Sequence, residues 1–406
     1  MSPYLVDISR TISRIGRGFA TGIDRVEIAY IKYCLRGNPA NLFIAKMGRH
    51  TVVIDQKVMA EVLEQLNSSN DWGWPTLGDA VRFKLNWEQR CARSYLKRRA
   101  LAKALNRDVS KLLVKIDASG FEYLNVGHSN LSETFFSALR LSNCKKIHVL
   151  IHDMIPLDHP EFSQRHIPRL FENRMRAVAK YADRIICNSD DTRKRVSGYF
   201  EEWGSKAEYV VSHLGIEPMP SSIASKPPFD RPYFVVLGTI EPRKNHLLLF
   251  KAWERLEIEL GEASLPYLFV VGRRGWDNIE AFQFLDESML AGKYIIEQQD
   301  LNDKNLADLL RHSNALLFPS FVEGFGLPAL EAAQLGVPVI CSDLDTFREI
   351  LGEEAVYLDP KSPEKWQAAI AQNLENTDLE QGIPTTRSNC VKIPTWESHF
   401  RHVFNQ

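Results

Sequence analysis

Short runs of aliphatic and β-branched residues alternate with longer amphipathic segments through both halves of this chain. Continuous apolar runs of this length, separated by helical stretches, are typical of buried parallel strands joined by crossover helices. The clearest runs are IHVLIHD (147–153), DRIICNS (183–189), YFVVLGT (233–239), LPYLFVVG (265–272), NALLFPS (314–320) and VPVICSD (337–343). The pattern predicts an α/β protein made of Rossmann-like, doubly wound sheets.

A proline-rich segment separates the two halves. At 406 residues the chain exceeds what one hydrophobic core usually supports. Residues 217–230 hold four prolines and three serines, the composition of a semi-rigid spacer. We predict a first domain at 1–216, a linker at 217–230, a second domain at 231–390, and a C-terminal helix within 391–406 that returns to the first domain. The two domains are expected to face each other across a cleft into which the strand ends open.

Composition favours a cytoplasmic location. The first residues, MSPYLVDISRTISRIG, contain no apolar core of secretory length, and no later apolar run approaches the roughly 18 residues of a membrane span. The six cysteines lie far apart without a CxxC pair. This spacing argues against a zinc site or a disulfide framework and fits a reducing compartment.

The segment 318–338 (FPSFVEGFGLPALEAAQLGVP) predicts a strand, a glycine-containing loop and a helix that begins near Pro328. Free backbone N–H groups at such a helix start suit phosphate or sugar oxygens. Glu323 precedes the loop and Glu331 lies one turn into the helix, so the two carboxylates can reach different parts of one ligand. Taken alone, the segment is equally compatible with two structural glutamates.

A second segment carries two adjacent cations. GTIEPRKN (238–245) follows the first strand of the second domain and places Arg243 and Lys244 at its carboxyl end. Such a pair can neutralise a diphosphate, Arg through a planar fork and Lys as a point charge. In isolation a Pro-Arg-Lys turn is more often solvated surface.

Together, four segments resemble the retaining glycosyltransferases of family four, which have the GT-B fold, and above all their bacterial mannosyltransferase-like members. These segments are GTIEPRKN (238–245), VGRRGW (271–276), the run from 318 to 343, and IHDMIPLDHPEF (151–162). The resemblance covers about residues 230 to 370 and shorter islands of the first domain. It implies transfer of a sugar from a nucleotide-diphosphate donor.

The resemblance implies roles for residues of the second domain. Glu331 would hold the donor ribose, while Arg243 and Lys244 would bind the diphosphate and stabilise its charge as the glycosidic bond breaks. Thr239 stands where relatives often carry Arg, so Arg243 is expected to replace it. The transferred sugar would be held by Glu323 and by the backbone amides of Gly324, Phe325, Gly326 and Leu327.

In the first domain, His152 matches the family's active-site histidine, and Asp153 beside it is expected on the acceptor side. A strand-end histidine without this HDxIP context is more often structural. Gly22 and Arg25 match the region that lies across the donor in relatives, although the usual Gly-Gly pair is absent.

The implied reaction retains the anomeric configuration through a front-side, oxocarbenium-like substitution in which the leaving phosphate helps to remove the acceptor proton. No DxD pair stands at a strand end, so we expect no metal, its task falling to Arg243 and Lys244. No cofactor is expected, because the nucleotide sugar is a substrate.

The resemblance favours GDP-mannose as donor, and leaves GDP-fucose, UDP-hexoses and dTDP-rhamnose open. The expected acceptor is a saccharide, in particular a lipid-linked one, in bacterial surface polysaccharide assembly such as that of lipopolysaccharide. A phosphorylase would need a cofactor-binding lysine that we cannot identify, and an epimerase would not need these motifs. A catalytically degenerate nucleotide-sugar-binding protein is the remaining alternative.

Positive charge is concentrated between Val81 and Lys115, where eleven Lys and Arg face two acids in a chain of net charge -1. A helical wheel gathers apolar residues from Phe83 to Val109 on one stripe and most cations outside it. The segment is either an ordinary surface helix or a peripheral contact with the anionic inner face of the cytoplasmic membrane. The residues expected to face that membrane are Arg90, Arg93, Lys97, Arg99 and Lys103. Nucleic acid is not expected, because the basic face lacks interleaved aromatics.

Overall fold

The computed structural model describes residues 2–17, 21–67, 72–116, 120–220, 229, 231–375, 377–378, 383–384 and 391–404. The chain divides into two compact units, one of Met1–Asn188 with Thr192–Ser212 and one of Ser189–Asp191 with His213–Gln406. Most of the predicted linker, 217–230, lies outside the described residues. The helix α17 (Trp396–Phe404) belongs to the second unit. Its predicted return to the first domain stays a prediction.

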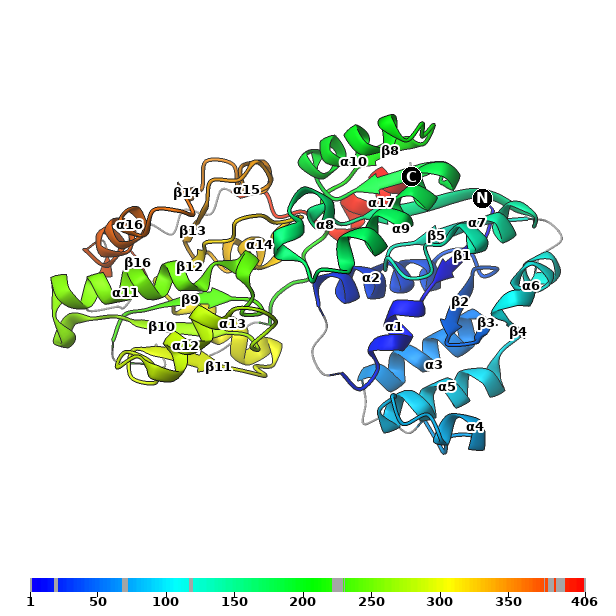
Figure 1. The fold of residues 1–406 in the computed structure, drawn as a ribbon, viewed down its shortest axis with the longest axis horizontal. Helices are drawn as coiled ribbons and strands as arrows, with labels where there is room; N and C mark the ends of the chain where they lie inside the picture. Colours follow the sequence, from blue (N-terminus) through cyan, green and yellow to red (C-terminus); the bar gives the residue numbers. More distant parts are fainter. Residues whose placement is uncertain are drawn as a thin grey trace. The chain divides into compact units, whose positions relative to one another are not determined.

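The first unit is built on an eight-stranded sheet of order β4-β3-β2-β1-β5-β6-β7-β8 (Figure 1). All neighbours are parallel except β3, which is antiparallel to β2 and to β4. This antiparallel extension was not predicted. The strands are β1 (Tyr4–Asp7), β2 (Leu42–Met47), β3 (His50–Ile54), β4 (Ala102–Leu105), β5 (Phe121–Asn125), β6 (Cys144–Ile151), β7 (Arg184–Cys187) and β8 (Glu208–Val211).

The intervening helices pack apolar faces against this sheet. Ser132 starts one of them by accepting a hydrogen bond from the Phe135 N–H, and Phe135 and Phe136 then pack on Tyr123 of β5. The helices are α1 (Ser9–Arg14), α2 (Gly22–Arg36), α3 (Gln56–Asn67), α4 (Leu77–Ala80), α5 (Trp87–Arg99), η1 (Asn106–Asp108), α6 (Val109–Ile116), α7 (Glu133–Arg140), α8 (Ile155–Asp158), η2 (Pro160–Phe162), α9 (Ile167–Tyr181) and α10 (Asp190–Glu202).

The second unit holds a six-stranded sheet of order β11-β10-β9-β12-β13-β14, parallel throughout (Figure 1). Counted from β9, this is the order 3-2-1-4-5-6 of the doubly wound fold, and the direction of winding reverses between β9 and β12. The strands are β9 (Tyr233–Leu237), β10 (Tyr267–Val271), β11 (Ile295–Gln298), β12 (Ala315–Phe318), β13 (Val339–Ser342) and β14 (Ala355–Leu358). A two-residue pair, β15 (Thr377–Asp378) and β16 (Ile383–Pro384), lies outside this sheet.

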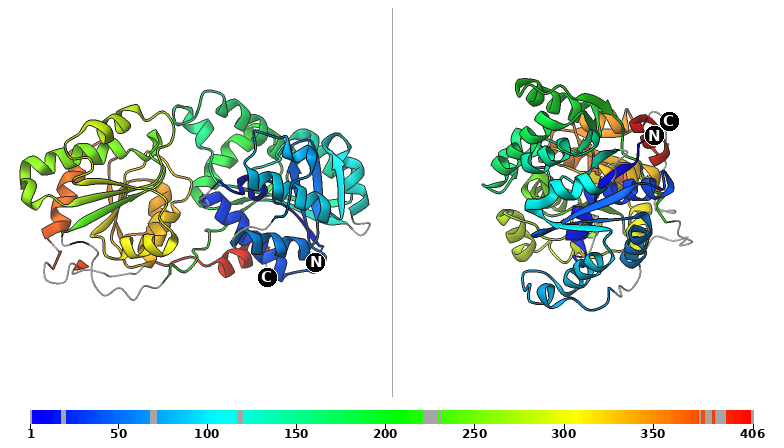
Figure 2. Two further views of the ribbon diagram at one scale, coloured as in Figure 1. Left: turned by 90° about the horizontal axis from the view of Figure 1, so that it is seen from below. Right: turned by 90° about the vertical axis from the view of Figure 1, so that its right-hand side faces the viewer.

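Helices cover both faces of the second sheet (Figure 2). Trp253 and Trp366, from two helices that pack on each other, are fully buried in its core. Burial of such large aromatic surfaces is a main source of core stability. The helices are η3 (Pro242–Lys244), α11 (His246–Leu260), η4 (Glu262–Ser264), α12 (Ile279–Glu287), α13 (Asp303–Arg311), α14 (Leu327–Gln334), α15 (Asp345–Leu351), α16 (Pro363–Glu375) and α17.

The α/β class with two Rossmann-like sheets is confirmed, and each of the six predicted apolar runs overlaps a strand whose sheet neighbours are parallel to it. None of the five cysteines within the described residues forms a disulfide, and four of them are buried. Among the described helices, none combines the length and the hydrophobicity that a membrane span requires.

The basic segment differs from the prediction. The helix α5 ends at Arg99, and the chain then continues as strand β4, so the wheel from Phe83 to Val109 does not describe one helix. Of the cations expected to face a membrane, Arg93 and Lys97 instead point at the carboxylate of Asp79. Arg99 pairs with Glu61 on α3. Arg93 and Lys97 are therefore held by an internal carboxylate, and their predicted contact with a membrane is not tested.

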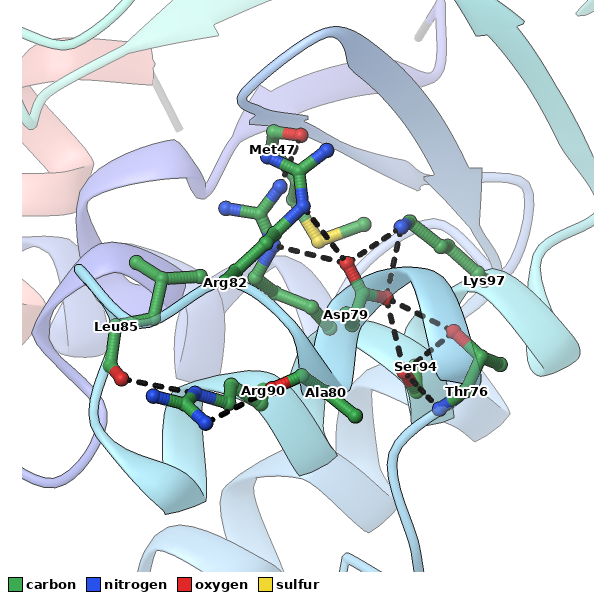
Figure 3. A network of polar contacts seen from close by, with 10 residues as sticks. Met47, Thr76, Asp79, Ala80, Arg82, Leu85, Arg90, Ser94 and Lys97 are labelled. Atoms are coloured by element: carbon green, nitrogen blue, oxygen red, sulfur yellow. Dashed lines mark hydrogen bonds and ion pairs between the residues drawn. The ribbon is translucent and has the colours of Figure 1, made fainter.

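Asp79 has no solvent-exposed side-chain area and gathers polar groups around it (Figure 3). Its carboxylate lies 2.7 Å from Lys97 Nζ, 3.3 Å from Arg82 Nε and 3.9 Å from Arg93 Nε, and accepts a hydrogen bond from Ser94 Oγ. Burial alone would raise the pKa of Asp79, but the hydrogen bonds from Lys97 and Ser94 and the neighbouring cations outweigh it, so that pKa is lowered. The ion cluster thus fixes α4 on α5.

The other two cations behave differently. Arg90 donates to the carbonyls of Leu85 and Ala80, which holds the turn between α4 and α5. Lys103 lies exposed on β4. Neither observation shows whether Arg90 and Lys103 face a membrane, so that prediction is not tested.

Replacing Asp79 by alanine should lower the free energy of unfolding by about 3 kcal/mol, because Arg93 and Lys97 would keep their charges in a buried site without a counter-ion. Asp108→Ala is the matched control, since the ion pairs of Asp108 within the described residues are with the exposed Arg107 and Lys111. Its cost should stay below about 1 kcal/mol. Urea denaturation of both variants measures the difference, and equal losses would contradict a structural role for the Asp79 cluster.

Candidate functional site

The carboxyl ends of β9 and β12 bring together three charged side chains that the sequence placed on separate segments. Glu323 Oε1 lies 2.8 Å from Arg243 Nη1 and 2.7 Å from Lys244 Nζ. The same oxygen accepts a hydrogen bond of 2.7 Å from Ser320 Oγ. The point where the winding of a doubly wound sheet reverses is where such folds bind ligands.

This cluster shifts the proton affinities of its members. Burial alone would raise the pKa of Glu323, but the charges of Arg243 and Lys244 outweigh it and lower that pKa to about 2. Burial lowers the pKa of Lys244, and the charge of Glu323 opposes this effect. Arg243 also pairs with Glu241 at 2.8 Å. Two cations are therefore held side by side by two carboxylates, which offsets their mutual repulsion.

Backbone contacts lock the two loops together. The N–H of Phe321 donates to the carbonyl of Arg243 at 2.9 Å, and Arg243 Nη1 donates to the carbonyl of Val322. Asn245, in the left-handed conformation with φ 55, donates its side-chain amide to the carbonyls of Pro319 and Pro360. An asparagine tolerates this backbone region better than most residues. The positions of Arg243 and Lys244 thus follow from the β12 loop.

Two glycines allow close contacts at this site. Gly238, directly after β9, has φ +141, and a Cβ there would lie 3.1 Å from Lys244 Cε. Gly326 has φ +103, and its Cβ would lie 2.7 Å from the ring of Phe347. A side chain at either position would strain the backbone and displace a neighbour.

The other predicted donor-site residues of the second unit lie on the segments that follow β9 and β12. Gly326 immediately precedes α14, with Pro328 in the first turn, and Glu331 on that helix is buried. Thr239 is exposed at the end of β9. The loop 324–327 therefore stands at a helix N-terminus, as the sequence predicts, and contact with a sugar is not tested.

In the first unit, His152 follows β6 and is buried. Its Nε2–H donates to the carbonyl of Val126 at 2.7 Å, and its own carbonyl accepts from Asn188 Nδ2. Burial lowers the pKa of His152 to about 4, so the imidazole is neutral at physiological pH, with Nδ1 unprotonated. The ring of His128 lies 4.9 Å from the His152 ring, centroid to centroid.

The remaining predicted residues of the first unit have local structural settings. Asp153 accepts a hydrogen bond from the Ile155 N–H at the start of α8. Gly22 is the first residue of α2, and Arg25 lies one turn further along it. Asp24 between them accepts hydrogen bonds from the Thr21 backbone and side chain. No contact shown here tests their donor or acceptor roles.

Sequence reasoning missed a polar cluster where the winding of the first sheet reverses, between β1 and β5. Asp7 ends β1, is buried, and accepts hydrogen bonds from Tyr123 Oη and Asn130 Nδ2. Glu27 of α2 is also fully buried. Burial, with a smaller effect from the charge of Asp7, raises the pKa of Glu27 to about 8. Asp7 could have been found from the sequence, because it is a polar residue at the end of an apolar run. Glu27 lies in the middle of a helix, where the sequence pattern gives no such signal.

Within the described residues, no group of three or more His, Cys, Asp or Glu side chains could hold a metal ion. The expectation of a reaction without metal or cofactor is not tested by this observation and stays a prediction.

The loops of the candidate site lie within a region that matches a known protein family. Residues 221–386 match the family model described as glycosyl transferases group 1. The second unit contains a glycosyl transferases group 1 domain. The Arg243, Lys244 and Glu323 cluster and the loop 324–327 all belong to this domain.

Relatives of the glycosyl transferases group 1 domain include named mannosyltransferases. The chain is 34% identical over 248 residues to the serotype-specific mannosyltransferase WbdA of Escherichia coli, covering 55% of this chain and 30% of that protein. It is 28% identical over 256 residues to the O-antigen chain mannosyltransferase B of Escherichia coli, covering 61% and 66%. The chain thus spans less than a third of the WbdA protein that it matches.

Solved structures share the fold. The structure of HepE from Anabaena in complex with UDP-glucose covers 100% of this chain and 99% of its own, with a TM-score of 0.64 and 14% identity. TarM from S. aureus covers 75% of this chain and 60% of its own, with a TM-score of 0.56 and 14% identity. These neighbours are GT-B glycosyltransferases, so the GT-B fold class is confirmed.

The buried Glu27 should make stability fall with rising pH. Its folded pKa of about 8 lies above the ordinary value of 4.5, so the folded state favours the protonated carboxyl. Its contribution is complete below pH 4.5 and is lost as the pH rises toward 8. Relative to Glu27→Gln, the wild-type free energy of unfolding should drop by about 1.4 kcal/mol per pH unit across this window.

Urea denaturation at a series of pH values measures this slope. The exposed Glu254→Gln on α11 serves as control, and its profile should run parallel to that of the wild type. Parallel profiles for Glu27→Gln as well would show that Glu27 is ionised in the folded protein.

Proposed function

We propose that this chain is a cytoplasmic, retaining glycosyltransferase that moves a hexose from a nucleotide-diphosphate sugar to a saccharide acceptor. The best candidate for the donor is GDP-mannose. The best candidate for the acceptor is a lipid-linked saccharide in bacterial surface polysaccharide assembly. The observation that carries the proposal is the convergence of Arg243, Lys244 and Glu323 where the winding of the second sheet reverses.

The chemistry of this cluster suits a diphosphate leaving group. Cleavage of the donor's glycosidic bond leaves negative charge on the diphosphate, and Arg243 and Lys244 are already oriented to receive it. Because Glu323 and Glu241 hold both cations before substrate arrives, little reorganisation is needed as charge develops. Glu323 Oε1 is occupied by these contacts, so its other oxygen is the one that we assign to a hydroxyl of the transferred sugar.

The other residues take the roles that the family resemblance gives them. Glu331 binds the donor ribose, and the amides of Gly324 to Leu327 bind the sugar. Thr239 lies beside the diphosphate and Gly22 across the donor, while Asp153 contributes to the acceptor side. His152 acts as a neutral imidazole, since burial lowers its pKa to about 4, and so it positions hydroxyl groups rather than supplying positive charge. The reaction needs no metal and no cofactor.

The mannosyl donor is supported by the names of the relatives, since WbdA and the O-antigen chain mannosyltransferase B are both mannosyltransferases. The match covers 30% of WbdA and 66% of the O-antigen chain mannosyltransferase B, so the identity of the donor is decided by experiment.

Thermal unfolding of the purified chain with GDP, UDP and dTDP, and with their sugar conjugates, tests the proposal. A ligand at 100 times its dissociation constant adds about 2.7 kcal/mol to the free energy of unfolding. Stabilisation by GDP alone supports mannose or fucose. Stabilisation by UDP or dTDP instead keeps the reaction class and overturns the donor. No stabilisation by any of them contradicts the transferase. For an active donor, NMR of the product's anomeric centre decides between retention and inversion.

Lys244→Ala should lower kcat about 100-fold to 1,000-fold, because one of two charges facing the leaving group is lost. Lys251→Ala, an exposed lysine on the adjoining helix α11, is the matched control and should leave kcat unchanged. Initial rates of sugar transfer measure both. Equal rates for Lys244→Ala and the wild type would remove Lys244 from the mechanism.

Glu323→Gln should strengthen binding of the nucleoside diphosphate and at the same time slow transfer of the sugar. Without the carboxylate, Arg243 and Lys244 carry more uncompensated positive charge, so the nucleoside diphosphate should bind on the order of tenfold more tightly. Transfer should nevertheless fall about 100-fold, because the sugar and the two cations lose their common anchor. Isothermal titration with the diphosphate and initial rates give the two quantities. Weaker diphosphate binding would show that Glu323 does not restrain these cations.

A further inference from the structure

The first unit exposes a group of large apolar side chains between residues 74 and 87. Five of the fourteen exposed large hydrophobic residues of the described chain lie in this short stretch, and the others are scattered over both units. The group, here termed the 74–87 surface, consists of Trp74 (80% exposed), Leu77 (89%), Val81 (65%), Phe83 (84%) and Trp87 (53%). Single exposed apolar residues are ordinary, but a concentration of this kind marks an interaction site.

Buried polar contacts hold the 74–87 surface in place. The Asp79 cluster fastens α4 to α5 through Lys97, Arg82 and Arg93 (Figure 3). With Asp79 directed inward, its neighbours Leu77 and Val81 on the same short segment remain outside. The carboxylate of Asp79 is thus buried while the apolar Leu77 and Val81 near it are exposed, the reverse of an ordinary surface helix.

Further contacts fix the aromatic rings. The rings of Trp74 and Trp87 meet edge to face with centroids 5.8 Å apart. The guanidinium of Arg90 lies over the Phe83 ring at 5.4 Å, and Arg98 Nη1 donates to the carbonyl of Trp74 at 3.0 Å. These aromatic side chains are therefore presented in a fixed arrangement, which lowers the entropy cost of binding.

The charge around the surface selects the partner. Between residues 72 and 99 there are seven Lys and Arg and two acids. Asp79 and Glu61 neutralise part of this charge, whereas Lys84 and Arg98 are exposed and form no ion pair within the described residues. Two copies of this chain meeting at this surface would bring like charges together, which is unfavourable. An anionic lipid surface instead complements both the cations and the aromatic rings.

We propose that the 74–87 surface docks on an anionic lipid bilayer. The indole rings of Trp74 and Trp87 lie at the level of the headgroups, where amphipathic aromatic rings are favoured, and Leu77 and Phe83 reach toward the acyl chains. Lys84 and Arg98 contact lipid phosphates. This peripheral contact involves side chains other than the basic residues first expected to make it, and it does not depend on which sugar is transferred.

Flotation of the full chain with vesicles tests the proposal. One set of vesicles is phosphatidylcholine alone, and the other is phosphatidylcholine mixed with phosphatidylglycerol. The protein should float with the anionic set. Leu77→Ser combined with Phe83→Ser should lower its partition coefficient about tenfold or more, because two inserted apolar side chains are lost. Lys84→Glu should lower it several-fold on anionic vesicles only.

Matched variants in the second unit provide the controls. Ile258→Ser with Met289→Ser removes two apolar side chains that are 86% and 89% exposed, and should leave flotation unchanged. Lys365→Glu makes the same charge change at another exposed lysine. Unchanged thermal unfolding would show that the 74–87 variants are folded.

Three outcomes would overturn the proposal. The first is no flotation with anionic vesicles, and the second is equal flotation of the wild type and the Leu77→Ser, Phe83→Ser variant. The third is a wild-type dimer in sedimentation velocity that this variant converts to a monomer, without vesicle binding. That result would assign the surface to a second copy of the chain.

Discussion

The contact between Glu323 and the two cations Arg243 and Lys244 organises the candidate donor site. One carboxylate oxygen is shared by both cations and by Ser320, so the loops after β9 and β12 cannot move independently without leaving a buried charge unpaired. Buried ion groups of this kind contribute little net stability compared with apolar packing. Their retention is explained better by a task that needs charge in a fixed position, and stabilising a diphosphate is such a task.

The same topological rule places polar groups in the first unit. Its winding reverses between β1 and β5, and Asp7, Glu27 and His128 gather there in positions that cost solvation energy. Desolvation raises the pKa of both carboxyls and lowers the pKa of His128. Burial thus disfavours the charged form of each of these three side chains.

The sequence was sufficient to predict features governed by local patterns. Apolar runs located six strands, β6, β7, β9, β10, β12 and β13, and Pro328 located the start of α14. It was insufficient where long-range pairing decides. The reversed direction of β3 has no local signature, and the pairing of Glu323 with Lys244 joins residues far apart in the chain. Orientation of the units and contact with any ligand are likewise outside the reach of a residue pattern.

The basic segment shows why a charge count can point the wrong way. The positive excess was counted from Val81 onward, and the acid that binds Arg93 and Lys97 is Asp79, two residues earlier. A helical wheel assumes that polar residues face water. A buried carboxylate instead attracts cations inward, because charges interact more strongly away from water. The Asp79 ion pairs thus hold, from the buried side, the segment on which Trp74, Leu77 and Phe83 are exposed.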